Sequence, residues 1–262
     1  MPTSSAGTSR LRESTNRPAF NRARLPCKKM NRIRMYNNKT LTKVRVWDLP
    51  TRLFHWALTT GITGLAISGT VGGNAMVWHF RFGYAVLALL LFRIVWGLVG
   101  GRWSRFGAFI YAPQSLIDYL KGKGKPEHGV GHTPVGALSV FAMLGFLALQ
   151  VGSGLISDDE IAFAGPLTAF VSNATVGLAT NYHANIGKWI LLGLVALHIA
   201  AIVFYLLRKH KLVQAMLHGD KEVVRPVPAS RDDLVSRTAA LLVFMLCAGL
   251  SYWVSTLESA AF

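Results

Sequence analysis

The chain has 262 residues, of which 52% are hydrophobic and only 15% are charged, and its mean hydropathy is +0.36. This composition is too apolar for an ordinary soluble domain and predicts a membrane protein. The net charge of +16 does not indicate a nucleic-acid-binding protein, because nearly all of the 28 lysines and arginines lie outside the apolar runs, where they report membrane topology.

Residues 1–43 are rich in Ser, Thr, Asn and Arg and contain no apolar run. They predict a basic, disordered tail rather than a signal peptide or a folded domain. Met30 and Met35 lie shortly before the first apolar run. Two explanations stay open: translation starts at one of these methionines, or the tail is real and is attracted to the membrane surface.

Five apolar runs are each close to the ~20 residues that a bilayer core requires. Because lipid cannot satisfy backbone polar groups, each run is expected to be a helix. The runs cover residues 53–72, 79–100, 134–156, 183–207 and 239–257. The expected fold is an all-α membrane protein. It has a four-helix transmembrane bundle over 44–218, a polar linker over 219–237 and a fifth, C-terminal transmembrane helix within 238–262.

The connections between these runs differ in charge. Lysine and arginine are concentrated before residue 53 and within 101–133 and 208–237, whereas 73–78 and 157–182 contain none. By the positive-inside rule the N-terminus is cytoplasmic and the C-terminus lies on the outer side. The outer connection 157–182 carries three acidic residues that either form a docking patch for a basic partner or are simply solvated: Asp158, Asp159 and Glu160.

Four of the eight histidines lie inside or at the rim of the apolar runs: His55, His79, His183 and His198. An ionisable side chain within a membrane is costly and suggests a function. His183 and His198 are separated by about 22 Å along their helix and by about 60° around it. One helix face can therefore serve two sites, which predicts an inner pair, His55 with His198, and an outer pair, His79 with His183.

Two histidines on opposite sides of an iron leave no open coordination position, so such a haem carries electrons and does not bind oxygen. We therefore predict two bis-His b-type haems, with these four histidines as the metal ligands. Two cysteines without a Cys-x-x-Cys-His motif exclude a covalently attached c-type haem. Gly69, Gly83 and Gly187 share helix faces with the histidines and either admit a flat macrocycle or serve ordinary helix packing.

Several cations are candidates for contacts with the cofactor. Arg93 lies about 21 Å below His79 on the same helix face, level with the inner pair. It could pair with a haem propionate, line a quinone pocket, or extend to the interface. Three further cations could neutralise propionates or act as interfacial anchors: Arg52, Arg81 and Lys188. His132 could pass protons to a quinone, or be a surface or helix-start histidine.

Residues 46–56 (VWDLPTRLFHW) resemble the opening of the bacterial cytochrome b561 and nickel-hydrogenase b-type cytochrome family. Further similar segments are 92–97 (FRIVWG), 131–137 (GHTPVGA) and 196–199 (ALHI), and the resemblance covers about 44–218. It implies a four-helix bundle in the bacterial inner membrane, with the C-terminus periplasmic. It also implies two b haems on the four histidines. Members pass electrons between the membrane quinone pool and a periplasmic redox partner, either a hydrogenase or other dehydrogenase or a c-type cytochrome.

Three functions are therefore considered. The first is an electron-transfer subunit of an oxidoreductase, with membrane lipid, quinone and a periplasmic redox protein as its partners and with no catalytic residue of its own. The second is a stand-alone enzyme that oxidises superoxide or another small donor and reduces quinone. The third is a haem-free, histidine-based metal or proton transporter, which the lack of acidic residues within the apolar runs disfavours.

Overall fold

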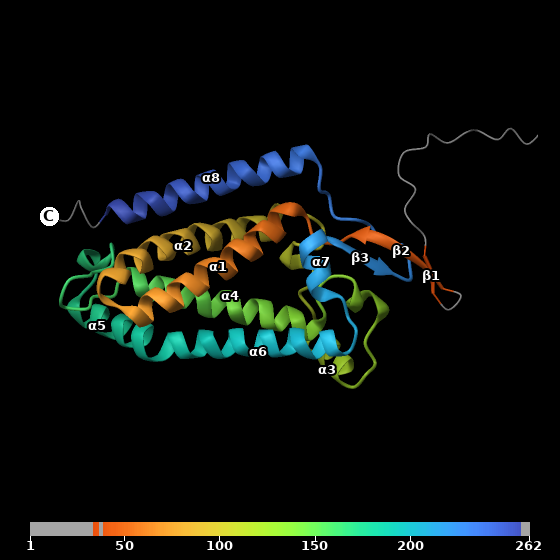
Figure 1. Ribbon diagram of the computed structural model, residues 1–262, viewed down its shortest axis with the longest axis horizontal. Helices are drawn as coiled ribbons and strands as arrows, with labels where there is room; N and C mark the ends of the chain where they lie inside the picture. The colour runs from red at the N-terminus through yellow and green to blue at the C-terminus, as the bar shows by residue number, and fades with distance from the viewer. Residues whose placement is uncertain (1–33, 37–38, 258–262) are drawn as a thin grey trace, which may run out of the picture. The chain divides into compact units, whose positions relative to one another are not determined.

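The computed structural model describes residues 34–36 and 39–257 and is mainly helical (Figure 1). Its five long helices are α1 (Leu49–Val71), α2 (Met76–Val99), α4 (Pro134–Leu155), α6 (Lys188–Leu207) and α8 (Leu234–Thr256). Its shorter helices are α3 (Pro113–Leu120), α5 (Asn173–Asn181) and α7 (Leu212–His218). Each of the five expected runs begins within five residues of the start of the corresponding long helix. The hydrophobic pattern thus located all five.

The long helices form one bundle, in which α1 packs against α2, α4 packs against α6, and α8 lies along α2 (Figure 1). Val86 and Leu90 of α2 meet Leu147 of α4 and Leu191 of α6 in a buried cluster. A second cluster combines side chains of α1, α2 and α8: Phe54, Leu89, Phe92, Trp96, Ala240 and Cys247. The C-terminal helix therefore shares a core with the bundle.

One end of the bundle, here called the strand end, carries three antiparallel strands. They are β1 (Arg34–Tyr36), β2 (Lys39–Arg45) and β3 (Asp220–Val223), in the order β1-β2-β3. Within Thr42–Val46 polar and β-branched apolar residues alternate, which favours a strand with one buried face. The described end of the expected tail and the start of the expected linker are thus β-structure, whereas residues 1–33 lie outside the described residues.

Four helical stretches are long and apolar enough to cross a membrane: Gly73–Val99, Pro134–Leu155, Asn173–Leu207 and Leu234–Thr256. Helix α1 has 23 residues but is less apolar than these four. It contains Thr59, Thr63 and Thr70, whose hydroxyls donate to the carbonyl four residues earlier in the same helix. That bonding lowers the cost of placing them in an apolar environment.

A π-turn, Tyr182–Gly187, joins α5 to α6 and contains His183. Because each of its hydrogen bonds spans five residues, a π-turn holds one residue more than an α-turn. The expected rotation of about 60° around the helix axis from His183 to His198 therefore changes by about 100°, which is one residue's step. The two side chains are then about 40° apart, with the rotation in the opposite sense. The sequence pattern assumed a regular helix and did not reveal this turn, but both histidines still share one side of the helix.

Candidate functional site

At the end of the bundle next to α5, called the α5 end, His79 of α2 faces His183 of the π-turn. Their ring centroids lie 6.0 Å apart and the ring planes are nearly perpendicular, at 88°. Two imidazoles bound to opposite sides of one metal at about 2.0–2.1 Å, with about 1 Å more from nitrogen to ring centre, have centroids about 6 Å apart. The pair is therefore spaced as two axial ligands of one metal would be.

Hydrogen bonds fix the tautomer of both rings at the α5 end. His79 Nδ1 lies 3.1 Å from the Leu65 carbonyl oxygen, and His183 Nδ1 lies 2.8 Å from the Gln150 carbonyl oxygen. A carbonyl oxygen can only accept, so Nδ1 carries the hydrogen in both rings. Each Nε2 is then left with the lone pair that a metal needs.

The second pair, His55 of α1 and His198 of α6, lies nearer the strand end, and the two rings are close enough to interact electrostatically. The His55 ring meets the edge of Trp56 at 5.1 Å. Its Nδ1 is buried and has no hydrogen-bond partner among the described residues. A buried polar nitrogen without a partner is unusual in a native protein. The unpaired Nδ1 of His55 is consistent with a ring that is held in place by a bound cofactor rather than by protein hydrogen bonds.

The number of protein ligands distinguishes a haem-binding site from a site for a bare metal ion. Within the part of the chain that the structure describes, no group of three or more His, Cys, Asp or Glu side chains could hold a metal ion. A protein site for a bare transition metal usually supplies three or four ligands. A haem brings its own equatorial nitrogens and needs only axial ligands. Pairs of histidines therefore fit haem and do not fit a bare ion.

Arg93 is buried near the strand end, with only 3% of its surface exposed. Its Nη2 donates to the Ser104 carbonyl oxygen at 3.1 Å, and its guanidinium lies 4.6 Å from the centre of the Phe106 ring. The other terminal nitrogen, Nη1, is buried without a partner among the described residues. The side chain therefore does not extend to the interface, and it keeps one donor for an anionic or carbonyl group.

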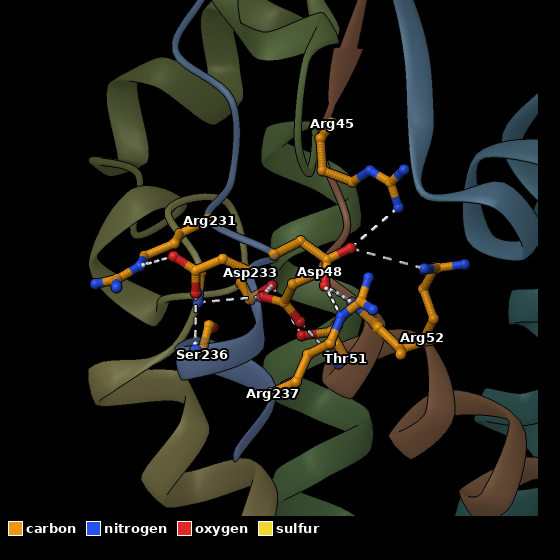
Figure 2. Close-up of polar contacts among 12 residues, drawn as sticks. Arg45, Asp48, Thr51, Arg52, Arg231, Asp233, Ser236 and Arg237 are labelled. Carbon is orange, nitrogen blue, oxygen red and sulfur yellow. Dashed lines mark hydrogen bonds and ion pairs between the residues drawn. The ribbon is translucent and has the colours of Figure 1, made fainter. Parts of the chain in front are cut away.

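Asp48 is a functional candidate that the sequence pattern did not single out. It is fully buried at the N-terminus of α1, where Oδ1 accepts from Thr51 N at 2.8 Å (Figure 2) and from Trp96 Nε1. Its Oδ2 accepts from Gly101 N and, at 2.8 Å, from Ser104 Oγ. The carboxylate also attracts Arg93. The sequence did contain a pattern that could have pointed to Asp48. It lies two residues before a proline at a helix start, and this is a common N-cap pattern.

The other three candidate cations differ in their surroundings. Arg52 Nη1 donates to the Leu217 carbonyl oxygen at 2.7 Å, and Nη2 lies 4.0 Å from Asp232. Asp232 also pairs with Arg45 and Arg237, and Figure 2 shows these three arginines converging. This network holds the start of α8 against the start of α1.

Arg81 and Lys188 are exposed near the α5 end. The Arg81 guanidinium lies 4.9 Å from the Trp78 ring and the Lys188 amine lies 5.5 Å from the Trp189 ring. Cations beside tryptophan are typical of a membrane interface. Both side chains are therefore placed as interfacial anchors, and both remain free to reach an anion.

The half-buried His132 lies between the rings of Trp47 and Phe109, whose centres lie 4.7 and 4.3 Å from its own, and its Nδ1 is buried. Desolvation of the ring, followed by repulsion from Arg93 and Lys221, lowers the pKa of His132 to about 3. It is therefore a neutral imidazole at pH 7.

Two of the three glycines that shared faces with the histidines pack against protein side chains. Gly69 meets the His79 ring, and Gly187 meets Gln150 and Tyr182, whereas Gly83 has open space where a Cβ would lie. Only Gly83 keeps room for the approach of a flat ring.

The acidic loop at the α5 end uses two of its carboxylates internally. Asp159 Oδ1 accepts from the backbone N–H groups of Ile161, Ala162 and Phe163, and Asp158 Oδ1 accepts from Glu160 N. These bonds hold the pKa of Asp159 below its usual value. The acids therefore shape the loop as well as charging it.

A family model described as prokaryotic cytochrome b561 matches residues 46–219. The chain is 22% identical over 215 residues to the probable Ni/Fe-hydrogenase B-type cytochrome subunit of Rhizobium leguminosarum bv. viciae, covering 68% of this chain and 88% of that protein. The similarly named protein of Azotobacter vinelandii is 25% identical over 215 residues, with the same two shares. The probable Ni/Fe-hydrogenase 1 B-type cytochrome subunit of Escherichia coli (strain K12) is 24% identical over 187 residues, 59% of this chain and 80% of that protein.

Proposed function

Because the chain belongs to the prokaryotic cytochrome b561 family and is a multi-pass membrane protein, we propose that it is a di-haem b-type cytochrome that passes electrons across the membrane. The observation that carries the proposal is the His79–His183 pair, with centroids 6.0 Å apart and both Nδ1 hydrogens donated to backbone carbonyls. His79 and His183 would hold one haem, and His55 and His198 the other. Each bound haem would supply an iron that gains and loses one electron.

The chain's own residues orient the ligands and supply charge near them. Arg93 is suited to a propionate of the strand-end haem, because its Nη1 is buried without a described partner. Arg81 and Lys188 are suited to propionates at the α5 end, where both are exposed. Arg52 is less suited, since Leu217 and Asp232 already engage it. The four histidines lie on α1, α2, the π-turn and α6, and each is half-buried among the described residues.

We place the quinone site at the strand end, beside Arg93 and His132. Because the pKa of protonated His132 is about 3, the neutral ring is a weak base. Its proposed role there is to accept or donate a hydrogen bond to the quinone rather than to take up a proton. The relatives are named as hydrogenase subunits, which favours a hydrogenase as the redox partner over a c-type cytochrome. A stand-alone oxidoreductase that acts on superoxide is the alternative, and purified protein would then turn over without a partner.

The proposed orientation has the basic strand end in the cytoplasm and the α5 end in the periplasm of a bacterial inner membrane, in agreement with the distribution of lysine and arginine. Helix α1 would cross together with the four more apolar stretches, because the connections on its two sides lie at opposite ends of the bundle (Figure 1). Five crossings would put the C-terminus in the periplasm.

The test is a reduced-minus-oxidised absorbance spectrum of the purified protein, with haem quantified per chain and repeated for His→Ala at each of the four positions. We expect two b haems in the natural chain. The His55→Ala and His198→Ala variants should lose one haem, and His79→Ala and His183→Ala should lose the other. A colourless natural protein would refute the proposal, and retention of both haems in all four variants would refute the ligand assignment.

A further inference from the structure

Helices α1 and α4 present the same three-part arrangement to the histidine that follows each of them. In both, one backbone carbonyl accepts the hydrogen of the imidazole Nδ1. The residue three positions later is a serine whose Oγ lies within 3.4 Å of the same carbonyl oxygen, and the next residue is a glycine in contact with the ring. The two segments are Leu65-Ala-Ile-Ser68-Gly69 and Gln150-Val-Gly-Ser153-Gly154.

In α1 the acceptor is the Leu65 carbonyl, at 3.1 Å from His79 Nδ1. Ser68 Oγ donates to the Gly64 carbonyl oxygen at 2.6 Å, and it lies 3.4 Å from the Leu65 oxygen and 3.5 Å from His79 Nδ1. A Cβ on Gly69 would lie 3.0 Å from both Cε1 and Nδ1 of His79. A side chain at this position would therefore displace the ring by a few tenths of an ångström.

The arrangement in α4 repeats these contacts. The Gln150 carbonyl oxygen lies 2.8 Å from His183 Nδ1, and Ser153 Oγ donates to that oxygen at 3.0 Å. Ser153 Oγ is also 3.5 Å from His183 Nδ1. A Cβ on Gly154 would lie 2.7 Å from Cε1 and 3.0 Å from Nδ1 of His183. Two helices of different sequence thus hold two imidazoles in the same way.

We propose that Ser68–Gly69 and Ser153–Gly154 are positioning pairs that set the orientation and basicity of both axial ligands of the α5-end haem. The inference rests on the proposed function. A hydrogen bond from Nδ1 makes a metal-bound imidazole more basic, and a more basic ligand stabilises oxidised iron. The glycines permit this bond, and in α4 Ser153 weakens it by donating to the same carbonyl.

His55, at the strand end, lacks this arrangement. Its Nδ1 has no hydrogen-bond partner among the described residues, so no carbonyl there raises the basicity of that ring. The two proposed haem sites therefore differ in the hydrogen bonding of at least one ligand. The two glycines lower the potential of the α5-end haem by permitting these hydrogen bonds, and Ser153 partly offsets that effect.

The experiment is a redox titration of the haem-loaded Gly69→Ala and Gly154→Ala variants, with haem counted first. Both substitutions should push a ring away from its carbonyl and shift the reduction equilibrium of the same haem several-fold toward reduction, while the other haem is unchanged. The Gly152→Ala variant is the matched control, because Gly152 lies in α4 with open space at its Cβ position. It should leave both potentials unchanged.

The Ser68→Ala and Ser153→Ala variants provide a second measurement that needs no added volume. Ser153→Ala frees the Gln150 carbonyl from a competing donor, so the potential of the same haem should move in the opposite direction. Ser68→Ala should move it less, because Ser68 Oγ donates mainly to the Gly64 carbonyl. Unchanged potentials in all four variants, or equal shifts of both haems, would overturn the inference. Two haems per chain in the natural protein would show that the proposed function stands even then, whereas no haem in the natural protein would refute the proposed function itself.

Discussion

Asp48 accepts hydrogen bonds from four donors that belong to α1, to α2 and to the turn after α2. Replacement by alanine would leave these buried donors unpaired, at about 1–3 kcal/mol for each unsatisfied group. We expect Asp48→Ala to cost at least about 3 kcal/mol and to lower the thermal midpoint in detergent by many degrees. Asp118→Ala is the control, since that carboxylate is half-exposed and, among the described residues, accepts a hydrogen bond from Gln114 alone. Equal midpoints for the two variants would contradict the role given to Asp48.

His132 makes stability depend on pH. Its pKa of about 3 in the folded protein is lower than the value near 6.5 in the unfolded chain, so between these values the unfolded state binds more protons. Stability should therefore be complete above about pH 6.5 and should fall below it, by up to about 1.4 kcal/mol per pH unit. The His132→Phe variant keeps a ring between Trp47 and Phe109 and should lose this dependence. Thermal midpoints from pH 7 to pH 5 test it, with the exposed His210→Phe as control.

Single residues were predictable where chemistry is visible in the chain itself. The four histidines stood out because ionisable groups are rare in apolar runs. The surroundings of Arg93 and His132 could not be predicted, because Ser104, Phe106, Trp47 and Phe109 reach them only through tertiary packing.

Among the elements, α8 offers a sharp comparison, because Ala239 and Ala240 are adjacent but face in different directions. Ala240 is buried against α1 and α2, whereas Ala239 is exposed. Ala240→Leu should overfill this contact and cost about 1–3 kcal/mol, while Ala239→Leu should change stability by less than about 0.5 kcal/mol. Thermal unfolding of both variants in detergent measures the difference. Equal stability would mean that α8 is only loosely attached to the bundle.

The hydrophobic pattern predicted the long helices well, because a bilayer demands a run of fixed length. It did not predict β2, although Val44 and Val46 alternate with polar residues, because a strand so short is convincing only beside its partner. That partner, β3, follows α7 far along the chain. The π-turn was missed for a related reason, since its extra residue leaves no mark in a hydrophobic pattern.

For the whole molecule, alternating topology is the main prediction. Alkaline phosphatase fused after Asn74, after Glu160 or at the C-terminus should be active, because each site would lie in the periplasm. Fusions after Lys123 or Lys211 should be inactive. An inactive Asn74 fusion would show that α1 does not cross, and an inverted pattern at every site would show that the strand end lies in the periplasm.

The small sheet at the strand end has a consequence for biosynthesis. β2 leaves the ribosome before any helix, but its partner β3 is made only after α7, so the ladder from Thr42↔Val223 to Arg45↔Asp220 must wait for α1 to α7. Pairing between segments so distant in sequence is slow. Gly219, whose carbonyl accepts from Val46 N and Trp47 N, arrives equally late. The β2–β3 ladder therefore forms only after α1 to α7 have been made. A nascent chain that stalls before β3 would lack the strand that pairs with the segment just before α1.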